Sequence, residues 1–110
     1  TGAFTTSATY GATITGGVQS LSGAGAVDLT NLITELTTTG ADALTLADGT
    51  TSGQVKIVTM IVDGGDGTLT PVTFANGTTI TFDAVAESVT LVWNSTIGWV
   101  ATSVQGATIA

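Results

Sequence analysis

The side chains that could do chemistry in this 110-residue chain are eight carboxylates, many hydroxyls and one lysine. Histidine, cysteine and arginine are absent, which removes the usual general base at neutral pH, the thiolate nucleophile and the arginine clamp of phosphoryl transfer. A pair of carboxylates can hydrolyse a glycoside, but most acids here adjoin glycine, alanine or a turn signal, where a carboxylate usually braces a turn. We therefore expect no enzymatic activity, no catalytic residues and no cofactor.

Asp63 and Asp66 lie in the glycine-rich segment DGGDG, residues 63–67. Such a segment can bind calcium through carboxylate and carbonyl oxygens. It lacks both the EF-hand spacing and the repeated nonapeptide of calcium-binding β-helices. A hairpin turn explains the segment more simply, so we expect no metal site.

Two tryptophans and two asparagines are the remaining candidates for binding or modification. Trp93 and Trp99 fall on consecutive predicted strands, where exposed rings could stack on a sugar and buried rings would belong to the core or to a subunit interface. We favour the buried interpretation. Asn76-Gly-Thr78 and Asn94-Ser-Thr96 are formal glycosylation acceptors, but both asparagines also stand where a turn favours this residue.

The amino-acid composition is typical of an all-β protein, so strands and turns must position these side chains. The chain has 25 threonines and 15 glycines against one proline. Threonine suits a pleated surface and glycine supplies turns, so the two together favour strands over helices.

Short apolar segments separated by turn signals predict about seven strands. Asp48-Gly49, Asp63-Gly64, Asp66-Gly67 and Asn76-Gly77 are the dipeptides of type I′ hairpin turns. The predicted strands are 32–38, 43–46, 54–62, 69–74, 79–82, 88–93 and 99–104. The first competes with a helix, because Leu29, Leu32, Ile33 and Leu36 have helical spacing after Asp28, but its threonines favour a strand. We expect a small antiparallel sandwich or barrel.

Residues 1–26 differ from the rest of the chain. Large apolar side chains are thinly spread there among Gly, Ser, Thr and Ala, too thinly to offset the entropy of ordering the backbone in isolation. We expect an extended N-terminal arm over 1–26, either frayed or ordered on a neighbouring subunit, and a β domain over 27–110.

The segment 55–62 carries apolar residues on both faces of its predicted strand, which indicates that both faces are covered. A neighbouring subunit is the economical source of the second cover in a chain of this length. Lys56 either marks the rim of that contact, with its stem on apolar surface, or is a solvated lysine at a strand end.

Charge narrows the range of partners. Only 8% of the residues are charged and the net charge is −7, with Lys56 the single basic side chain. Nucleic acid and anionic membranes are therefore not expected partners, because nothing neutralises their phosphates. So few charges also leave self-association unopposed.

Several motifs resemble a group of small virion proteins of tailed bacteriophages and cyanophages. They are 44–50 (LTLADGT), 53–56 (GQVK), 63–71 (DGGDGTLTP), 79–82 (TITF), 87–93 (ESVTLVW) and 98–100 (GWV). The resemblance covers residues 27 to about 107 and implies a β-rich module that decorates a capsid or forms a fibre or spike, commonly as a homotrimer. It supplies no functional residues.

The leading hypothesis from the sequence is a capsid decoration or cement protein on the outer surface of the virion. Its partners would be copies of itself and the major capsid protein or a neighbouring virion subunit, with the arm gripping the shell or a neighbour. Two alternatives stay open. One is an extracellular filament subunit that polymerises by donor-strand exchange, and the other is a carbohydrate-binding fibre module that uses Trp93 and Trp99.

Overall fold

The computed structural model describes residues 16–110. Alternating apolar and polar residues form short strands throughout this part of the chain. The strands are β1 (Val18–Ser22), β2 (Gly25–Val27), β3 (Ile33–Thr37), β4 (Asp42–Leu46), β5 (Val55–Val62), β6 (Gly67–Pro71), β7 (Ile80–Phe82), β8 (Ser88–Asn94), β9 (Gly98–Gln105) and β10 (Thr108–Ile109). Residues 16–110 contain no helix, and hence none with the length and apolarity to cross a bilayer.

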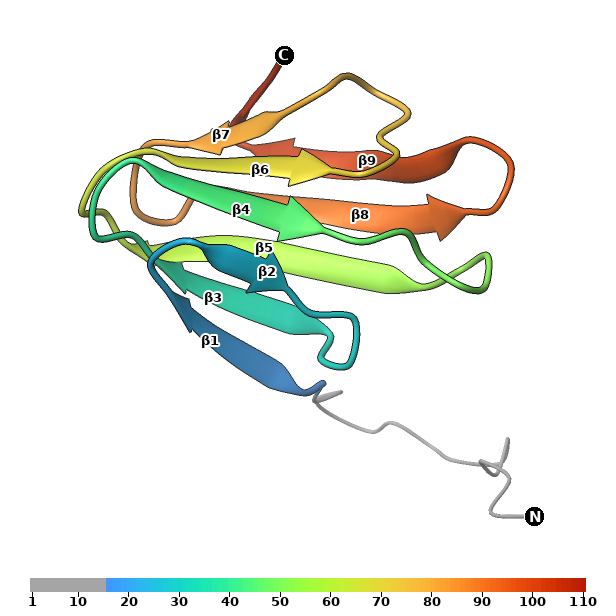
Figure 1. Ribbon diagram of the computed structural model, residues 1–110, viewed down its shortest axis with the longest axis horizontal. Coiled ribbons are helices and arrows are strands. Elements are labelled where there is room, and N and C mark those ends of the chain that lie inside the picture. Colours follow the sequence, from blue (N-terminus) through green and yellow to red (C-terminus); the bar gives the residue numbers. More distant parts are fainter. Residues whose placement is uncertain (1–15) are drawn as a thin grey trace.

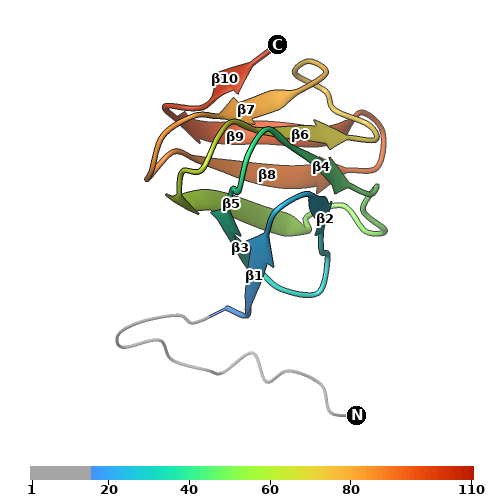
Figure 2. The same cartoon turned by 60° about the vertical axis from the view of Figure 1, so that its left-hand side comes forward.

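The strands form two five-stranded sheets that pack face to face (Figures 1 and 2). Sheet A has the order β1-β3-β5-β8-β9, and sheet B has the order β10-β7-β6-β4-β2. In each sheet the strands from the first half of the chain pair in parallel, and those from the second half pair antiparallel. The architecture is an open sandwich of two mixed sheets.

The parallel half is built from three successive coils. Each coil places one strand in sheet A and the next in sheet B, so that β1 and β2, β3 and β4, and β5 and β6 stack on one another. The chain then reverses direction, and β7 to β10 extend both sheets by antiparallel pairing. Neighbouring strands in the first half are therefore one whole coil apart in sequence.

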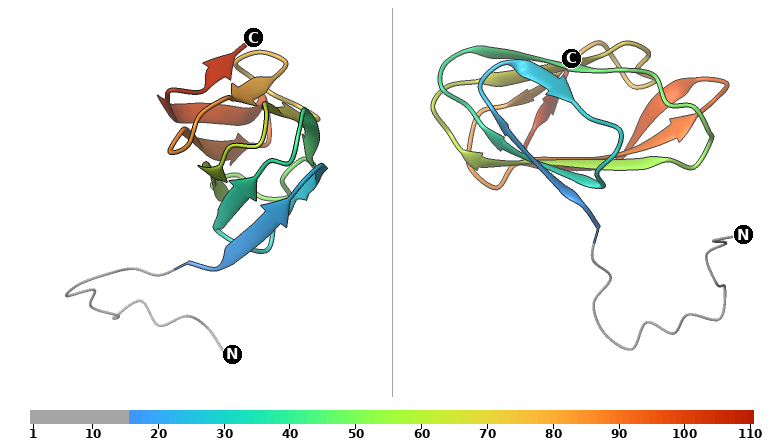
Figure 3. Two further views of the ribbon diagram at one scale, coloured as in Figure 1. Left: turned by 90° about the vertical axis from the view of Figure 1, so that its left-hand side faces the viewer. Right: turned by 60° about the horizontal axis from the view of Figure 1, so that its bottom comes forward.

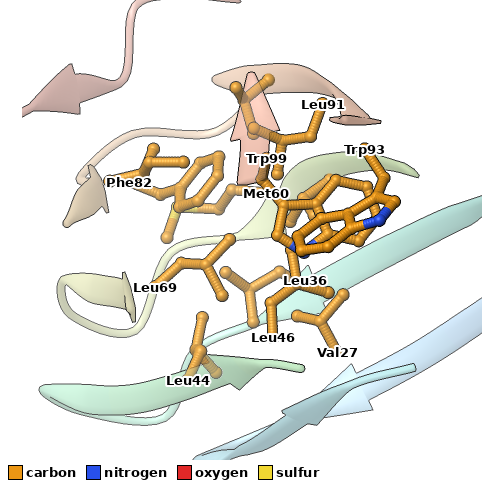
Figure 4. Packing of buried hydrophobic residues seen from close by; sticks show 13 residues of the cluster. Val27, Leu36, Leu44, Leu46, Met60, Leu69, Phe82, Leu91, Trp93 and Trp99 are labelled. Atoms are coloured by element: carbon orange, nitrogen blue, oxygen red, sulfur yellow. The ribbon is translucent and has the colours of Figure 1, made fainter. Parts of the chain in front are cut away.

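The core lies between the sheets and is lined by every second residue of each strand (Figure 4). In β5, for example, Lys56, Val58 and Met60 point inward and are buried. The buried apolar residues come from both sheets: Val27, Leu36, Leu44, Leu46, Val58, Met60, Leu69, Ile80, Phe82, Val89, Leu91, Trp93 and Trp99.

The sequence predicts the all-β class correctly but not the pairing. An antiparallel sheet was expected, whereas half of the strand pairs are parallel, and the sandwich alternative is confirmed over the closed barrel. Seven strands lie at or near their predicted positions, and β1, β2 and β10 were not predicted. The helical alternative is wrong, because 29–32 forms bends and 33–37 is strand β3.

The boundary of the predicted arm is also wrong. Residues 18–26 were assigned to the arm because most of their side chains are small, but they contain β1 and all of β2 except its last residue, Val27, at one edge of the two sheets. Parallel pairing with β3 and β4 supplies the backbone hydrogen bonds that their own side chains cannot replace. The remainder of the predicted arm, residues 1–15, lies outside the described residues.

The Asp-Gly and Asn-Gly dipeptides do not form type I′ turns, since none of their residues has a positive φ. Gly64 belongs to the corner between β5 and β6, which lie in different sheets and do not pair. A Cβ on Gly64 or Gly65 would collide with the backbone of the corner in the coil before, at Thr38 and Gly40. Glycine is needed here because the corners stack closely.

Thr38 links these two corners through its buried hydroxyl. The hydroxyl donates to the carbonyl of Gly65 at 2.7 Å and accepts from the backbone N–H of Gly64 at 2.9 Å. The backbone N–H of Thr38 donates to the carbonyl of Val62 at 3.0 Å. One side chain therefore joins the second coil to the third.

We predict that Thr38→Val lowers the free energy of unfolding by about 1–2 kcal/mol, because it removes two hydrogen bonds made by a buried hydroxyl and leaves the N–H of Gly64 and the carbonyl of Gly65 without this partner. Denaturant unfolding measures the loss. Thr39→Val, at the exposed neighbouring position, is the matched control and should change stability by less than about 0.5 kcal/mol. Equal losses in the two variants would contradict the role given to the Thr38 hydroxyl.

Candidate functional site

The acidic residues singled out by the sequence do not converge. Among residues 16–110, no group of three or more His, Cys, Asp or Glu side chains is placed to hold a metal ion, and no pocket is found. The Asp63 carboxylate accepts a hydrogen bond from the N–H of Gly65 at 3.1 Å, and the carbonyl of Asp66 accepts one from the N–H of Asp42 at 3.0 Å. Both aspartates thus brace the corner that precedes β6.

The two tryptophans are core residues, as the sequence favoured. Trp93 is 8% exposed and Trp99 is 1% exposed, and their rings meet edge to face with centroids 5.4 Å apart (Figure 4). The indole N–H of Trp99 donates to the carbonyl of Ala47 at 2.9 Å. Gly49 lies against the Trp93 ring, where a Cβ would collide with it. Neither ring presents a face for stacking on a sugar.

The two asparagines hold loops in place. The side-chain carbonyl of Asn94 accepts hydrogen bonds from the N–H groups of Thr96 and Ile97, at 2.9 and 3.2 Å, in the hairpin between β8 and β9. This confirms the turn interpretation for Asn94. The side-chain carbonyl of Asn76 accepts from the N–H of Ala101 at 2.8 Å, so it ties the loop before β7 to β9.

Lys56 is buried rather than solvated or placed at a rim. Its side chain is 1% exposed, and its ammonium donates to the Asp28 carboxylate at 2.9 Å and to the carbonyl of Asn31 at 3.0 Å. Asp28 also accepts from the backbone and side-chain amides of Asn31. The pair joins the third coil to the loop that ends the first. The sequence signal for the burial of Lys56 was that it shares one face of the predicted strand with Val58 and Met60.

Burial and hydrogen bonding act in opposite directions on Asp28. Partial burial raises the pKa of its carboxyl, but hydrogen bonds from Lys56 and Asn31 outweigh burial and lower the net pKa below the ordinary value of 3.8. The ionised carboxylate is therefore stabilised by folding. This stability is present above the unfolded-state pKa and is lost as the pH falls through the lower, folded-state pKa.

The outer side of sheet A is the candidate functional surface. We define the outer apolar face as Val18, Ile33 and Ile57 in one row and Val55, Val92 and Val100 in the next, all on the side away from the core. Strand register places each row across three adjacent strands. Val18 is 49% exposed and Val55 is 41% exposed, and the other four are half-buried. Six β-branched side chains thus form a band across all five strands.

This face carries almost no charge. Glu35 is the only charged residue on the outward positions of the strands of sheet A, because Lys56 points inward. The corresponding side of sheet B is lined by hydroxyls, with Thr45, Thr68 and Thr70 on its parallel strands. The two sides of the sandwich therefore differ, and only that of sheet A is apolar.

The sequence identified part of this surface. It predicted that β5 is apolar on both sides and needs cover on both, and the structure covers only the inward side within residues 16–110. The sequence did not indicate that β1, β3, β8 and β9 extend the apolar band. This extension depends on the register between strands, which no local sequence pattern encodes.

We predict that Asp28→Asn destabilises the protein at neutral pH by roughly 3 kcal/mol, because the buried Lys56 ammonium loses its counter-charge. The difference from the parent protein should shrink as the pH falls through the folded-state pKa of Asp28, where the parent carboxylate is also neutral. Denaturant unfolding at a series of pH values measures both effects.

Lys56→Met is the matched variant, because it replaces the buried charge by an apolar chain of similar length. Asp28 is 29% exposed and can be solvated, so the loss should be smaller, about 1 kcal/mol or less. Adding Lys56→Met to Asp28→Asn should recover most of the stability. A larger loss for Lys56→Met than for Asp28→Asn would show that the charge itself is not what needs a partner.

In comparisons with known proteins, no family model and no curated protein sequence matches the chain. The expectation of a phage structural protein, which rests on the resemblance described above, therefore stays a prediction. The case for a function rests on the surface of the chain.

Proposed function

We propose that this chain is a non-enzymatic structural subunit of a bacteriophage particle, a capsid decoration protein that self-associates and binds the shell. The observation that carries the proposal is the outer apolar face of sheet A. A continuous apolar band on a sheet marks a surface that another protein covers. Sheets pack in this way through interdigitated side chains about 10 Å apart.

A second copy of the chain is the occupant that the charges favour. Only Glu35 interrupts the face with charge, so two copies can approach there with little electrostatic repulsion. Elsewhere the acids lie mainly in the loops and corners, where they limit contact between other parts of the surface.

The two rows of the face suit a closed ring of subunits. The row on β1, β3 and β5 lies on one half of sheet A, and the row on β5, β8 and β9 lies on the other half. If one row of each copy packs against the other row of the next, the contact is head to tail, and it forms a closed ring when the rotation between successive copies closes on itself. The homotrimer implied by the resemblance is the closed form that we propose.

Burial of the only basic side chain supports a protein partner over nucleic acid. Lys56 is the single Lys or Arg in the sequence and is engaged in the core. No lysine or arginine is left to contact phosphate groups, which supply most of the affinity of a protein for nucleic acid. The major capsid protein or a neighbouring virion subunit is the partner proposed for the shell.

The carbohydrate-binding alternative is not favoured by the structure. It needs an exposed Trp93 or Trp99, and both rings are buried against each other.

We predict that the purified protein has a solution mass that is a multiple of the 10.8 kDa chain mass, threefold for the trimer. Val55→Glu should weaken self-association by at least about tenfold, because a carboxylate would be buried without a partner in the contact. Self-association should strengthen with salt, since every copy carries net negative charge. Light scattering coupled to size exclusion measures the mass.

The matched control is Val72→Glu, which makes the same change at a 71% exposed valine outside the face. It should leave the mass unchanged, and thermal unfolding should show that both variants are folded. A wild-type protein that stays a monomer at millimolar concentration would contradict self-association through the outer apolar face. A Val55→Glu variant with the wild-type mass would contradict it as well.

Location on the particle needs a separate measurement. An antibody against the protein should label the head surface of intact phage particles in immunogold electron microscopy, and antibody saturated with purified protein should not. Label confined to the tail or fibres would contradict the decoration role. Absence of the protein from purified particles would contradict the virion assignment altogether.

A further inference from the structure

The loop between β6 and β7 covers the first part of β9, the last strand of sheet A, and lies beside the C-terminal end of the chain (Figures 1 and 3). The N–H of Trp99 donates to the carbonyl of Thr73 at 2.9 Å, and the carbonyl of Trp99 accepts from the N–H of Ala75 at 2.8 Å. The N–H of Ala101 donates to the side-chain carbonyl of Asn76 at 2.8 Å. The side chain of Asn76 thus continues the pairing that the loop backbone begins.

The residue after Asn76 is a glycine whose backbone nitrogen is free to react. The N–H of Gly77 makes no hydrogen bond within residues 16–110, whereas the N–H of Thr78 donates to the carbonyl of Ala110 at 2.6 Å. Gly77 is exposed and has no side chain to hinder its approach to the Asn76 amide. A backbone nitrogen can attack the side-chain amide of the preceding asparagine and close a succinimide ring. Gly77 therefore supplies an intramolecular nucleophile.

The hydrogen bond from Ala101 favours this attack. It draws electron density from the side-chain carbonyl of Asn76, and it stabilises the negative charge that develops on this oxygen when the carbonyl carbon is attacked. The side-chain nitrogen of Asn76 has no hydrogen-bond partner in the described part of the chain, and the residue is exposed, so water can protonate this nitrogen as it leaves. The carbonyl is therefore activated, and both the nucleophile and the leaving group are free.

The other two asparagines of the sequence lack this combination. Asn94 is also exposed, and its side-chain carbonyl also accepts hydrogen bonds from backbone N–H groups. However, the N–H of Ser95 is held by the hydroxyl of Ser52 at 2.9 Å. The side-chain amide of Asn31 is itself hydrogen-bonded, and a leucine follows it. Only Asn76 has an exposed amide next to an unbound glycine nitrogen.

We propose that Asn76 is a site of spontaneous deamidation in the folded protein. The nitrogen of Gly77 forms a bond to the side-chain carbonyl carbon of Asn76 and loses its proton to water. The bond from this carbon to the side-chain nitrogen breaks, the nitrogen takes up a proton, and ammonia leaves a succinimide behind. Water then adds to either carbonyl of the succinimide and opens the ring. The products are aspartate and iso-aspartate at position 76.

The two products differ in their effect on β9. Aspartate adds a negative charge but keeps a side-chain oxygen for the N–H of Ala101. Iso-aspartate lengthens the main chain by one methylene and shortens the side chain, so its carboxylate moves away from this N–H. Residues 102–105 of β9 are already exposed, and the loss of this bond extends the unpaired edge back to Ala101. The inference does not depend on the proposed function.

Peptide mapping by mass spectrometry tests the proposal on the folded, full-length protein after incubation at mildly alkaline pH. Aspartate and iso-aspartate should accumulate at position 76 at least about tenfold faster than at position 31 or 94, because a hydrogen bond must break before either of those amides can react.

A matched pair of variants separates the effect of the structure from that of the dipeptide. Ser95→Gly places a second glycine after an asparagine, but the N–H of residue 95 can still donate to Ser52. Asn94 should therefore remain about tenfold slower than Asn76 in this variant. Adding Ser52→Ala removes the acceptor and should raise the rate at Asn94 by about the same factor. Thermal unfolding should show that both variants are folded.

Two results would overturn the proposal. If Asn76 stays intact in the folded protein and converts only in a denatured sample, the fold protects the amide. If Asn94 converts as fast as Asn76 in the Ser95→Gly variant, the dipeptide alone sets the rate and the hydrogen bonds around each asparagine do not.

Discussion

Close stacking of the corners between coils is the constraint on which the rest of the structure depends. Parallel strands lie about 4.8 Å apart, so the corners that connect them to the other sheet must repeat at nearly the same spacing. Gly64 and Gly65 allow this because they have no Cβ, and the Thr38 hydroxyl adds two hydrogen bonds to the backbone bonds that already join the two corners. Both sheets, and the core between them, follow from this arrangement.

At the opposite end of the strands, an ion pair joins the third coil to the first. Lys56 reaches from the third coil to Asp28 and Asn31 in the loop of the first. A buried pair of this kind adds little net stability compared with apolar residues, but it penalises arrangements that leave one charge unpaired. The β-branched strands of this chain offer few other distinctions between one register and its neighbours, so the pair is well placed to select the observed one.

Sequence patterns were sufficient to predict where most strands lie, but not which strands pair with one another. Seven segments were predicted because alternation and turn residues are local signals, and Trp93 and Trp99 were correctly favoured as buried. The corner at 63–66 was mistaken for a hairpin because Asp-Gly serves both purposes, and its true role depends on a backbone one coil away. The strands at 18–22 and 25–27 were missed because their small residues acquire order from pairing. The surface on sheet A was seen only in β5, since its other members are assembled by register.

Burial of Lys56 has a practical consequence for how the folded state responds to proteolysis. Trypsin cleaves after lysine and arginine, and this sequence offers it a single position, Lys56, the second residue of β5, whose side chain is buried. Fraying of the ends or movement of the loops exposes no other target. The rate of tryptic cleavage therefore reports the opening of sheet A itself and provides a one-site measure of global unfolding in this protein.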